Sequence, residues 1–134
     1  MSIVPPNRRV INQGMNWITP HKRLAIYARD EFTCCYCKAT LADGIHLTLD
    51  HLKPYVRGGT NHETNLVTCC RYCNTARGMR PWWMFARLVA DRIGVSSQEI
   101  IARIRRNRYR AIRPAQAKAY IERCGSFTAA LQTR

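Results

Sequence analysis

The sequence has few acidic residues and no long hydrophobic run. Among its 134 residues, 8 are Asp or Glu and 22 are Lys or Arg, which leaves a formal net charge of +14. No stretch reaches the roughly 20 apolar residues that a membrane-spanning helix requires, and residues 1–20 lack the apolar segment of a signal peptide. We therefore expect a protein that is neither inserted in a membrane nor exported.

The excess of positive charge predicts a polyanionic partner. A charge of +14 on so small a chain creates a long-range positive field. Nucleic acids bind such surfaces through phosphate contacts and the release of counterions, so their affinity falls steeply with salt. Charge that serves solubility alone is the alternative, but soluble domains usually intersperse both signs. Nucleic acid is therefore the expected partner.

The cysteines favour a metal site. Seven cysteines, an odd number, do not suit a secreted disulfide framework. Four of the cysteines form two Cys-x-x-Cys pairs, Cys34 with Cys37 and Cys70 with Cys73. None of the other three cysteines has a second cysteine three residues away. Four thiolates suit tetrahedral Zn²⁺, and a closed shell of four sulfurs leaves no position for a substrate. We predict one structural zinc and a cytoplasmic location, with buried thiols or a disulfide as the alternative.

Between and around these pairs the patterns predict helices and short strands. Thr19 and Pro20 are typical of a helix start, and that helix should run to about residue 30. Residues 45–52 and 66–68 are expected to form strands, and a helix should follow from about Cys70 to Gly78. The long loop between the strands, with two adjacent glycines, has a length that is often functional.

The second half of the chain is helical and rich in arginine. Helices are expected from about 81 to 93, from 97 to 110 and from 114 to 124, followed by a short tail. Six arginines crowd residues 103–113 with few acidic residues nearby, which favours phosphate binding over a merely solvated face. Docking on an acidic partner protein is a further possibility for these arginines. The residues that we expect to contact nucleic acid are Arg57, Arg77, Arg103, Arg106 and Arg110.

Changes in composition and expected secondary structure along the sequence divide the chain into three parts. Residues 1–18 read as a flexible N-terminal arm, because they hold prolines and polar residues without periodicity. Residues 19–81 carry the cysteines and the polar motif described below, and we expect them to form the core. Residues 82–134 are expected to be a basic helical extension packed on that core.

Five polar side chains supply the types needed to hydrolyse a phosphodiester. An ordinary histidine side chain has a pKa of about 6.5, so the imidazole type at position 51 is suited to take a proton from an attacking water near neutral pH. Asp50 and Asn74 offer hard oxygen ligands of the kind that Mg²⁺ and Mn²⁺ prefer. Asn65 is expected to orient the imidazole. Arg77, three residues after Asn74 on a helix, is expected to grip the scissile phosphate.

The order of these residues resembles that of the HNH endonucleases, in the form of the family with four zinc-binding cysteines. The similarity covers roughly residues 24–81, and it is carried by the segments RDEFTCCYCKA, LTLDHLKPYVRGG and TNLVTCCRYCNTARG. It implies an α+β fold: a ββα-metal (His-Me finger) core with a structural zinc on four cysteines, flanked by an N-terminal helix and C-terminal helices.

The resemblance also implies roles for single residues. His51 stands at the first motif position as the general base, Asn65 at the second and Asn74 at the third, and Asp50 is the metal ligand before the base. The implied cofactors are one structural Zn²⁺ and one catalytic Mg²⁺ or Mn²⁺. The implied activity is hydrolysis of double-stranded DNA to 5′-phosphate and 3′-hydroxyl ends.

Two other functions agree with the same residues. One is a module that is stabilised by a structural zinc and binds nucleic acid without cleaving it. The other is a nuclease subunit, monomeric or dimeric, that is active only with a protein partner, as in phage DNA packaging. A requirement for Mg²⁺ or Mn²⁺ in cleavage separates the enzyme from the binding module.

Overall fold

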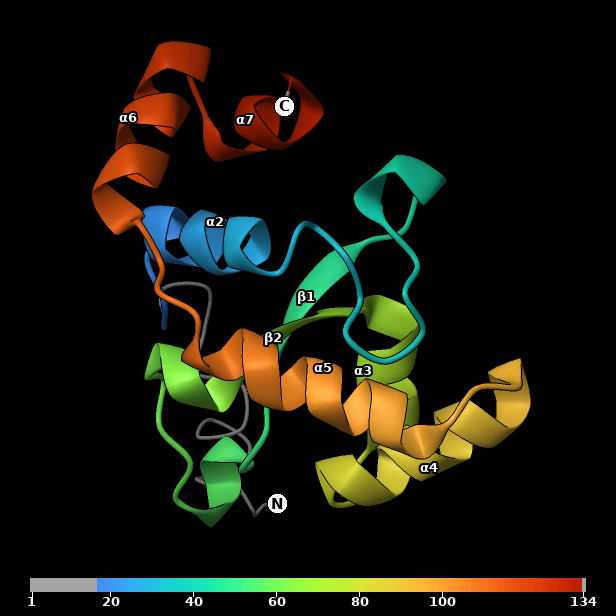
Figure 1. Ribbon diagram of the computed structural model, residues 1–134. Helices are drawn as coiled ribbons and strands as arrows, with labels where there is room; N and C mark the ends of the chain where they lie inside the picture. Colours follow the sequence, from blue (N-terminus) through green and yellow to red (C-terminus); the bar gives the residue numbers. More distant parts are fainter. Residues whose placement is uncertain (1–16, 134) are drawn as a thin grey trace, which may run out of the picture.

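The computed structural model describes residues 17–133 (Figure 1). The arm expected over residues 1–18 lies outside this part of the chain except for Trp17 and Ile18, of which Ile18 is buried. Among the described residues, no helix has both the length and the apolar character that crossing a bilayer would require.

A two-stranded antiparallel hairpin followed by a short helix forms the centre of the fold. Strand β1, Leu47–His51, pairs with β2, Leu66–Cys70, so that Leu47 lies opposite Cys70 and His51 opposite Leu66. Helix α3, Arg71–Arg77, starts directly where β2 ends, because the Cys70 sulfur accepts a hydrogen bond from the Cys73 amide at 3.3 Å. The second strand is two residues longer than expected. The α+β class predicted from the sequence is confirmed.

The loop between the two strands is compact. It contains two short 3₁₀ turns, Tyr55–Arg57 and Glu63–Asn65. The Gly59 amide donates to the Pro54 carbonyl oxygen at 3.0 Å, and a Cβ at Gly59 would lie 1.9 Å from the Lys53 carbonyl oxygen. Because no side chain fits there, a glycine is required for the loop to close on itself.

Helix α2, Pro20–Arg29, is attached to the back of the hairpin by a buried ion pair. Thr19 caps the helix through a 3.2 Å bond from the Lys22 amide to its hydroxyl, as expected. At the other end, Arg29 Nε donates to Asp30 Oδ1 at 2.8 Å, and Asp30 Oδ2 accepts from the Thr68 amide at 2.8 Å. The pair satisfies its own polar groups and the backbone of β2, which buried charges require.

Four helices complete the described chain: α4, Trp82–Ile93; α5, Ser97–Tyr109; α6, Pro114–Cys124; and α7, Phe127–Thr133. In Figure 1, α5 crosses β2, α4 lies against α5, and α6 lies beside α2. Helices α4 and α5 share a hydrophobic cluster with the cysteine turns and β2, whereas α6 and α7 pack with α2.

The tail expected after Gly125 is instead helix α7. Its first turn is capped by Ser126, whose hydroxyl accepts from the Ala129 amide at 3.0 Å. Ala130 is fully buried, and Phe127 and Leu131 pack on the clusters around α2. The spacing of these three apolar residues is that of one helical face, so packing stabilises a segment too short to be helical alone.

Candidate active site and metal centre

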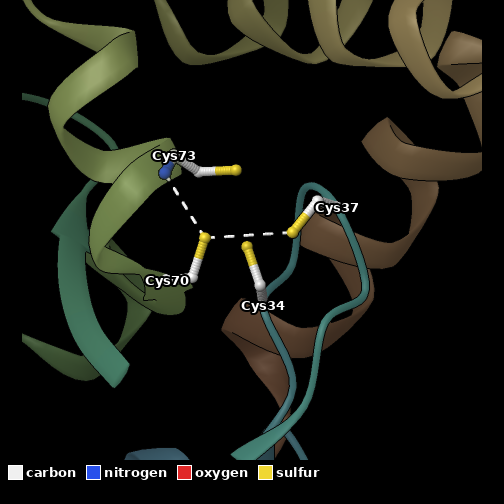
Figure 2. A group of neighbouring side chains, drawn as sticks. All are labelled: Cys34, Cys37, Cys70 and Cys73. Carbon is white, nitrogen blue, oxygen red and sulfur yellow. Dashed lines mark hydrogen bonds between the residues drawn. The ribbon is translucent and has the colours of Figure 1, made fainter. Parts of the chain in front are cut away.

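The four cysteines of the two Cys-x-x-Cys pairs converge on one point (Figure 2). Their sulfur atoms all lie within 4.8 Å of one another, and the Cys37 and Cys70 sulfurs are 3.8 Å apart. Four sulfurs placed about 2.3 Å from a central Zn²⁺ would be separated by about 3.8 Å. The cluster therefore fits a structural zinc, in the register predicted from the sequence.

The thiols of this cluster are strongly coupled. Hydrogen bonding with Cys34 lowers the pKa of Cys37 and raises the pKa of Cys73 above its ordinary value. When one of the four neighbouring thiols ionises, ionisation of the other three becomes less favourable, because the negative charges repel one another. A central divalent cation favours the thiolate form of every ligand, so metal binding here releases protons.

The first cysteine turn contains strained backbone positions. Glu31 and Lys38 adopt left-handed conformations with φ of 59° and 68°. A left-handed residue other than glycine costs about 1–2 kcal/mol. The turn keeps its shape because the Lys38 amide donates to the Cys34 carbonyl at 3.0 Å and the Cys34 amide to Ala39 at 2.8 Å.

A separate cleft of about 370 Å³ brings together four of the five predicted catalytic residues, namely Asp50, His51, Asn74 and Arg77. Asp50 and His51 reach it from the end of β1, and Asn74 reaches it from α3. The other lining residues lie before α2, in β1, in the loop between the strands, and at or just after the end of α3. They are Trp17, Leu49, Pro54, Tyr55, Val56, Arg77, Gly78 and Met79. The cleft is open to solvent.

The His51 imidazole is half-buried and held in place. Its Nε2 atom lies 2.8 Å from the Asn61 Oδ1 atom. The Trp17 ring lies with its centroid 4.9 Å from the imidazole centroid, and the Tyr55 ring is 6.1 Å away. Asn61 and Trp17 were not singled out from the sequence, because nothing in the spacing of a loop or an arm indicates which side chain it will meet.

Asp50 is buried at the floor of the cleft. Its two oxygens accept hydrogen bonds from Arg77 Nη1 at 2.7 and 2.8 Å, and Oδ2 also accepts from the Tyr36 hydroxyl at 2.8 Å. Burial raises the pKa of the Asp50 carboxyl, while the Arg77 charge and the Tyr36 hydrogen bond oppose that rise. A carboxylate has about four lone-pair sites, so these bonds leave Asp50 room to bind a cation through one oxygen.

Asn74 is anchored through its nitrogen. The Nδ2 atom donates to Thr48 Oγ1 at 3.0 Å and to the Leu49 carbonyl oxygen at 3.2 Å. Within residues 17–133, no donor contacts its Oδ1 atom. The amide is therefore fixed by β1 with a carbonyl oxygen left for a ligand.

Asn65 was expected to orient the imidazole through its side chain or its backbone, and in the structure it bonds to the backbone that follows His51 rather than to the imidazole itself. Its Oδ1 atom accepts from the Lys53 amide at 2.9 Å, and its Nδ2 atom donates to the carbonyl oxygens of Lys53 and Thr60 at 3.1 and 2.8 Å. The residue is buried at the foot of the loop, so its amide closes the loop. The contact with His51 is made by Asn61 instead.

Arg77 is also placed differently from the expectation that it grips a substrate phosphate. Its side chain is 3% exposed, and Nη1 donates to Asp50 and to the His51 carbonyl oxygen. Nη2 donates to the Leu52 carbonyl oxygen at 2.8 Å, and Nε to the Arg80 carbonyl oxygen at 2.9 Å. The guanidinium points from α3 into the hairpin, where it ties the end of β1 to the helix.

Arg103 and Arg106 of α5, together with Arg110 directly after it, line a second groove of about 270 Å³, which shares no lining residue with the cleft. Arg106 and Arg110 are exposed there, beside Lys38. Arg103 is engaged with the protein, because it donates to the Cys35 carbonyl oxygen at 2.7 Å and to Glu99 at 3.3 Å. Arg57 is exposed on the loop next to the cleft.

Comparison with known proteins identifies the central segment. The family model described as HNH endonuclease matches residues 34–80, which contain the four cysteines, Asp50, His51 and Asn74. A curated relative is the CRISPR-associated endonuclease Cas9 of Corynebacterium diphtheriae, which is 32% identical over 78 residues. That alignment covers 58% of this chain and 7% of the relative, so the chain spans only a small part of the length of that protein. No solved structure matches. Residues 34–80 of the chain therefore match the HNH endonuclease family.

Proposed function

We propose that the protein is a metal-dependent endonuclease that hydrolyses phosphodiester bonds of double-stranded DNA to 5′-phosphate and 3′-hydroxyl ends. The observation that carries the proposal is that His51, Asp50 and Asn74 line one open cleft at the end of β1. The match to the HNH endonuclease family supports a nuclease, and the net charge of +14 supports a nucleic acid substrate.

The cleft residues divide the chemistry between them. His51 is the general base, because its neutral imidazole can accept a proton from a water positioned against the phosphate. Asp50 and Asn74 would hold the divalent ion, each through one oxygen, and hard oxygen donors fit Mg²⁺ or Mn²⁺. When bound, that ion supplies electrostatic stabilisation of the charge that builds up on the phosphate oxygens. Arg77 supports this arrangement by holding Asp50.

The function can be tested by incubating purified, zinc-loaded protein with supercoiled plasmid. We expect nicking or linearisation with added Mg²⁺ or Mn²⁺ and none when the ion is omitted. Omission is a better control than a chelator, which would also withdraw zinc. If the cut ends carry 5′-phosphates, a DNA ligase should rejoin them without prior phosphorylation. Tight, salt-sensitive DNA binding without cleavage in any divalent ion would instead show a binding module.

The exposed arginines of the second groove are proposed to hold the DNA backbone outside the cleft. Arg106 lies on α5 and Arg110 directly follows that helix, with Lys38 lining the same groove, so a phosphate bound there can contact more than one cation. Arg57 would contact phosphates nearer the cleft. Arg103 and Arg77 are engaged with the protein, and their contribution to binding would be to hold their neighbours in place.

Substitution Arg106→Gln should weaken DNA binding and make it less dependent on salt. Each phosphate contact that is lost lowers the slope of log affinity against log salt by about 1. Arg105→Gln is the matched control, because Arg105 is exposed on the same helix but lies outside the groove. Fluorescence anisotropy with a labelled duplex across a salt series measures both slopes. Equal slopes for the two variants would contradict the assignment of the groove.

A further inference from the structure

The His51 side chain is held by a residue that belongs to no HNH motif position. Asn61 lies in the loop between the strands, and its Oδ1 atom is 2.8 Å from His51 Nε2. The Trp17 ring lies over the imidazole at a centroid distance of 4.9 Å and an angle of 39°. The contact with Asn61 therefore holds the edge of the imidazole, and the Trp17 ring restricts movement of its face.

The orientation of the Asn61 amide follows from its second contact. Its Nδ2 atom lies 3.4 Å from the Trp17 carbonyl oxygen, which can only accept a hydrogen bond. Nitrogen must therefore face Trp17, and oxygen must face His51. Because an amide oxygen also only accepts, the hydrogen between Asn61 and His51 must be carried by Nε2 of the imidazole.

The backbone around Asn61 is held as firmly as its side chain. The Lys22 ammonium donates to the Asn61 carbonyl oxygen at 2.9 Å, which ties the loop to α2. The preceding carbonyl oxygen, of Thr60, accepts from Asn65 Nδ2 at 2.8 Å. Gly59 has no space for a side chain against the Lys53 backbone. The acceptor for Nε2 is therefore part of a rigid loop.

We propose that Asn61 is a positioning residue that selects the Nε2–H tautomer of His51 and so leaves Nδ1 as the atom that takes the proton from water. A neutral imidazole has one donor and one acceptor nitrogen, so fixing the donor fixes the base. The proposal rests on the proposed function in that it assigns His51 the role of base. Asn61 touches neither substrate nor metal in this assignment and acts through the imidazole.

The tautomer can be measured without any reference to activity. Long-range ¹H–¹⁵N correlation spectra of the zinc-loaded full chain, labelled at histidine, distinguish protonated from unprotonated ring nitrogens. The pH is set well above the ordinary histidine pKa of about 6.5, and His51 is assigned from the signals missing in His51→Gln. We expect the proton of His51 on Nε2. A proton on Nδ1 in the unsubstituted protein overturns the proposal.

Two substitutions then link the tautomer to the rate. Asn61→Ala should give mixed His51 tautomers and lower kcat about 10- to 100-fold with KM unchanged, as is usual when a partner of a site residue is removed. Asn61→Asp keeps an acceptor at the same place and should restore both the Nε2–H signal and most of kcat. A folded Asn61→Ala protein with the parent tautomer and kcat overturns the proposal. Absence of cleavage by the parent would instead refute the proposed function and leave the spectroscopic result standing.

Discussion

Replacing His51 with alanine should lower the rate of DNA cleavage about 100- to 10,000-fold, the range that general-base catalysis typically contributes. The imidazole lies at the end of β1, half-buried on the cleft, with Asp50 and Asn74 on the same cleft. Its contacts are with Asn61 and Trp17 rather than with the hydrophobic core. The substitution should therefore remove the base while preserving the fold and the zinc.

The measurement is a single-turnover cleavage rate at saturating Mg²⁺, with zinc content and thermal unfolding recorded for each protein. His46→Ala is the matched control, because His46 is an exposed histidine just before β1 and does not line the cleft. We expect the control to cleave at the parent rate. Cleavage by His51→Ala at the parent rate, from equally pure protein, would refute the mechanism.

Replacing Cys73 with serine should abolish the zinc site and unfold the centre of the molecule. Structural zinc contributes about 10–16 kcal/mol in small zinc-finger peptides, whereas whole domains are stable by about 5–15 kcal/mol. The cluster joins the turn of residues 34–37 to the junction of β2 and α3, and the buried residues around it belong to the same core as α4 and α5. Loss of one ligand therefore affects several elements at once.

Far-UV circular dichroism during heating, with zinc determined by elemental analysis, tests this expectation. Cys124→Ser is the control, because Cys124 lies on α6 outside the four-cysteine cluster. We expect the control to keep its zinc and its Tm. A zinc-free Cys73→Ser protein with the Tm of the parent would show that the cluster does not hold a structural metal.

The cysteine cluster and the proposed catalytic metal site are joined by a single peptide bond, because Asn74 directly follows Cys73. Cys73 is fixed by the cluster, and the Asn74 amide is fixed by its bonds to Thr48 and Leu49. Unfolding of the zinc cluster should therefore displace Asn74 as well. If the protein cleaves DNA as proposed, loss of a structural ion that has no open position for substrate should therefore also reduce cleavage at the neighbouring cleft.

Features set by neighbours in the chain could be predicted closely. The Cys-x-x-Cys register, the Thr19 cap and the start of α3 all depend on residues three or four apart, so the sequence shows them directly. The final helix was missed because its stability comes from packing on α2, which no local pattern of seven residues reveals.

The amino-acid sequence by itself determined which residue types are available for chemistry: the four cysteines, the Asp50–His51 pair and Asn74. Only the tertiary structure decided what each polar side chain contacts. Arg77 bonds to Asp50 across 27 positions, and His51 to Asn61 across 10. The physical reason is that a buried polar group must find its partner wherever packing brings one, however far apart the two lie in the chain.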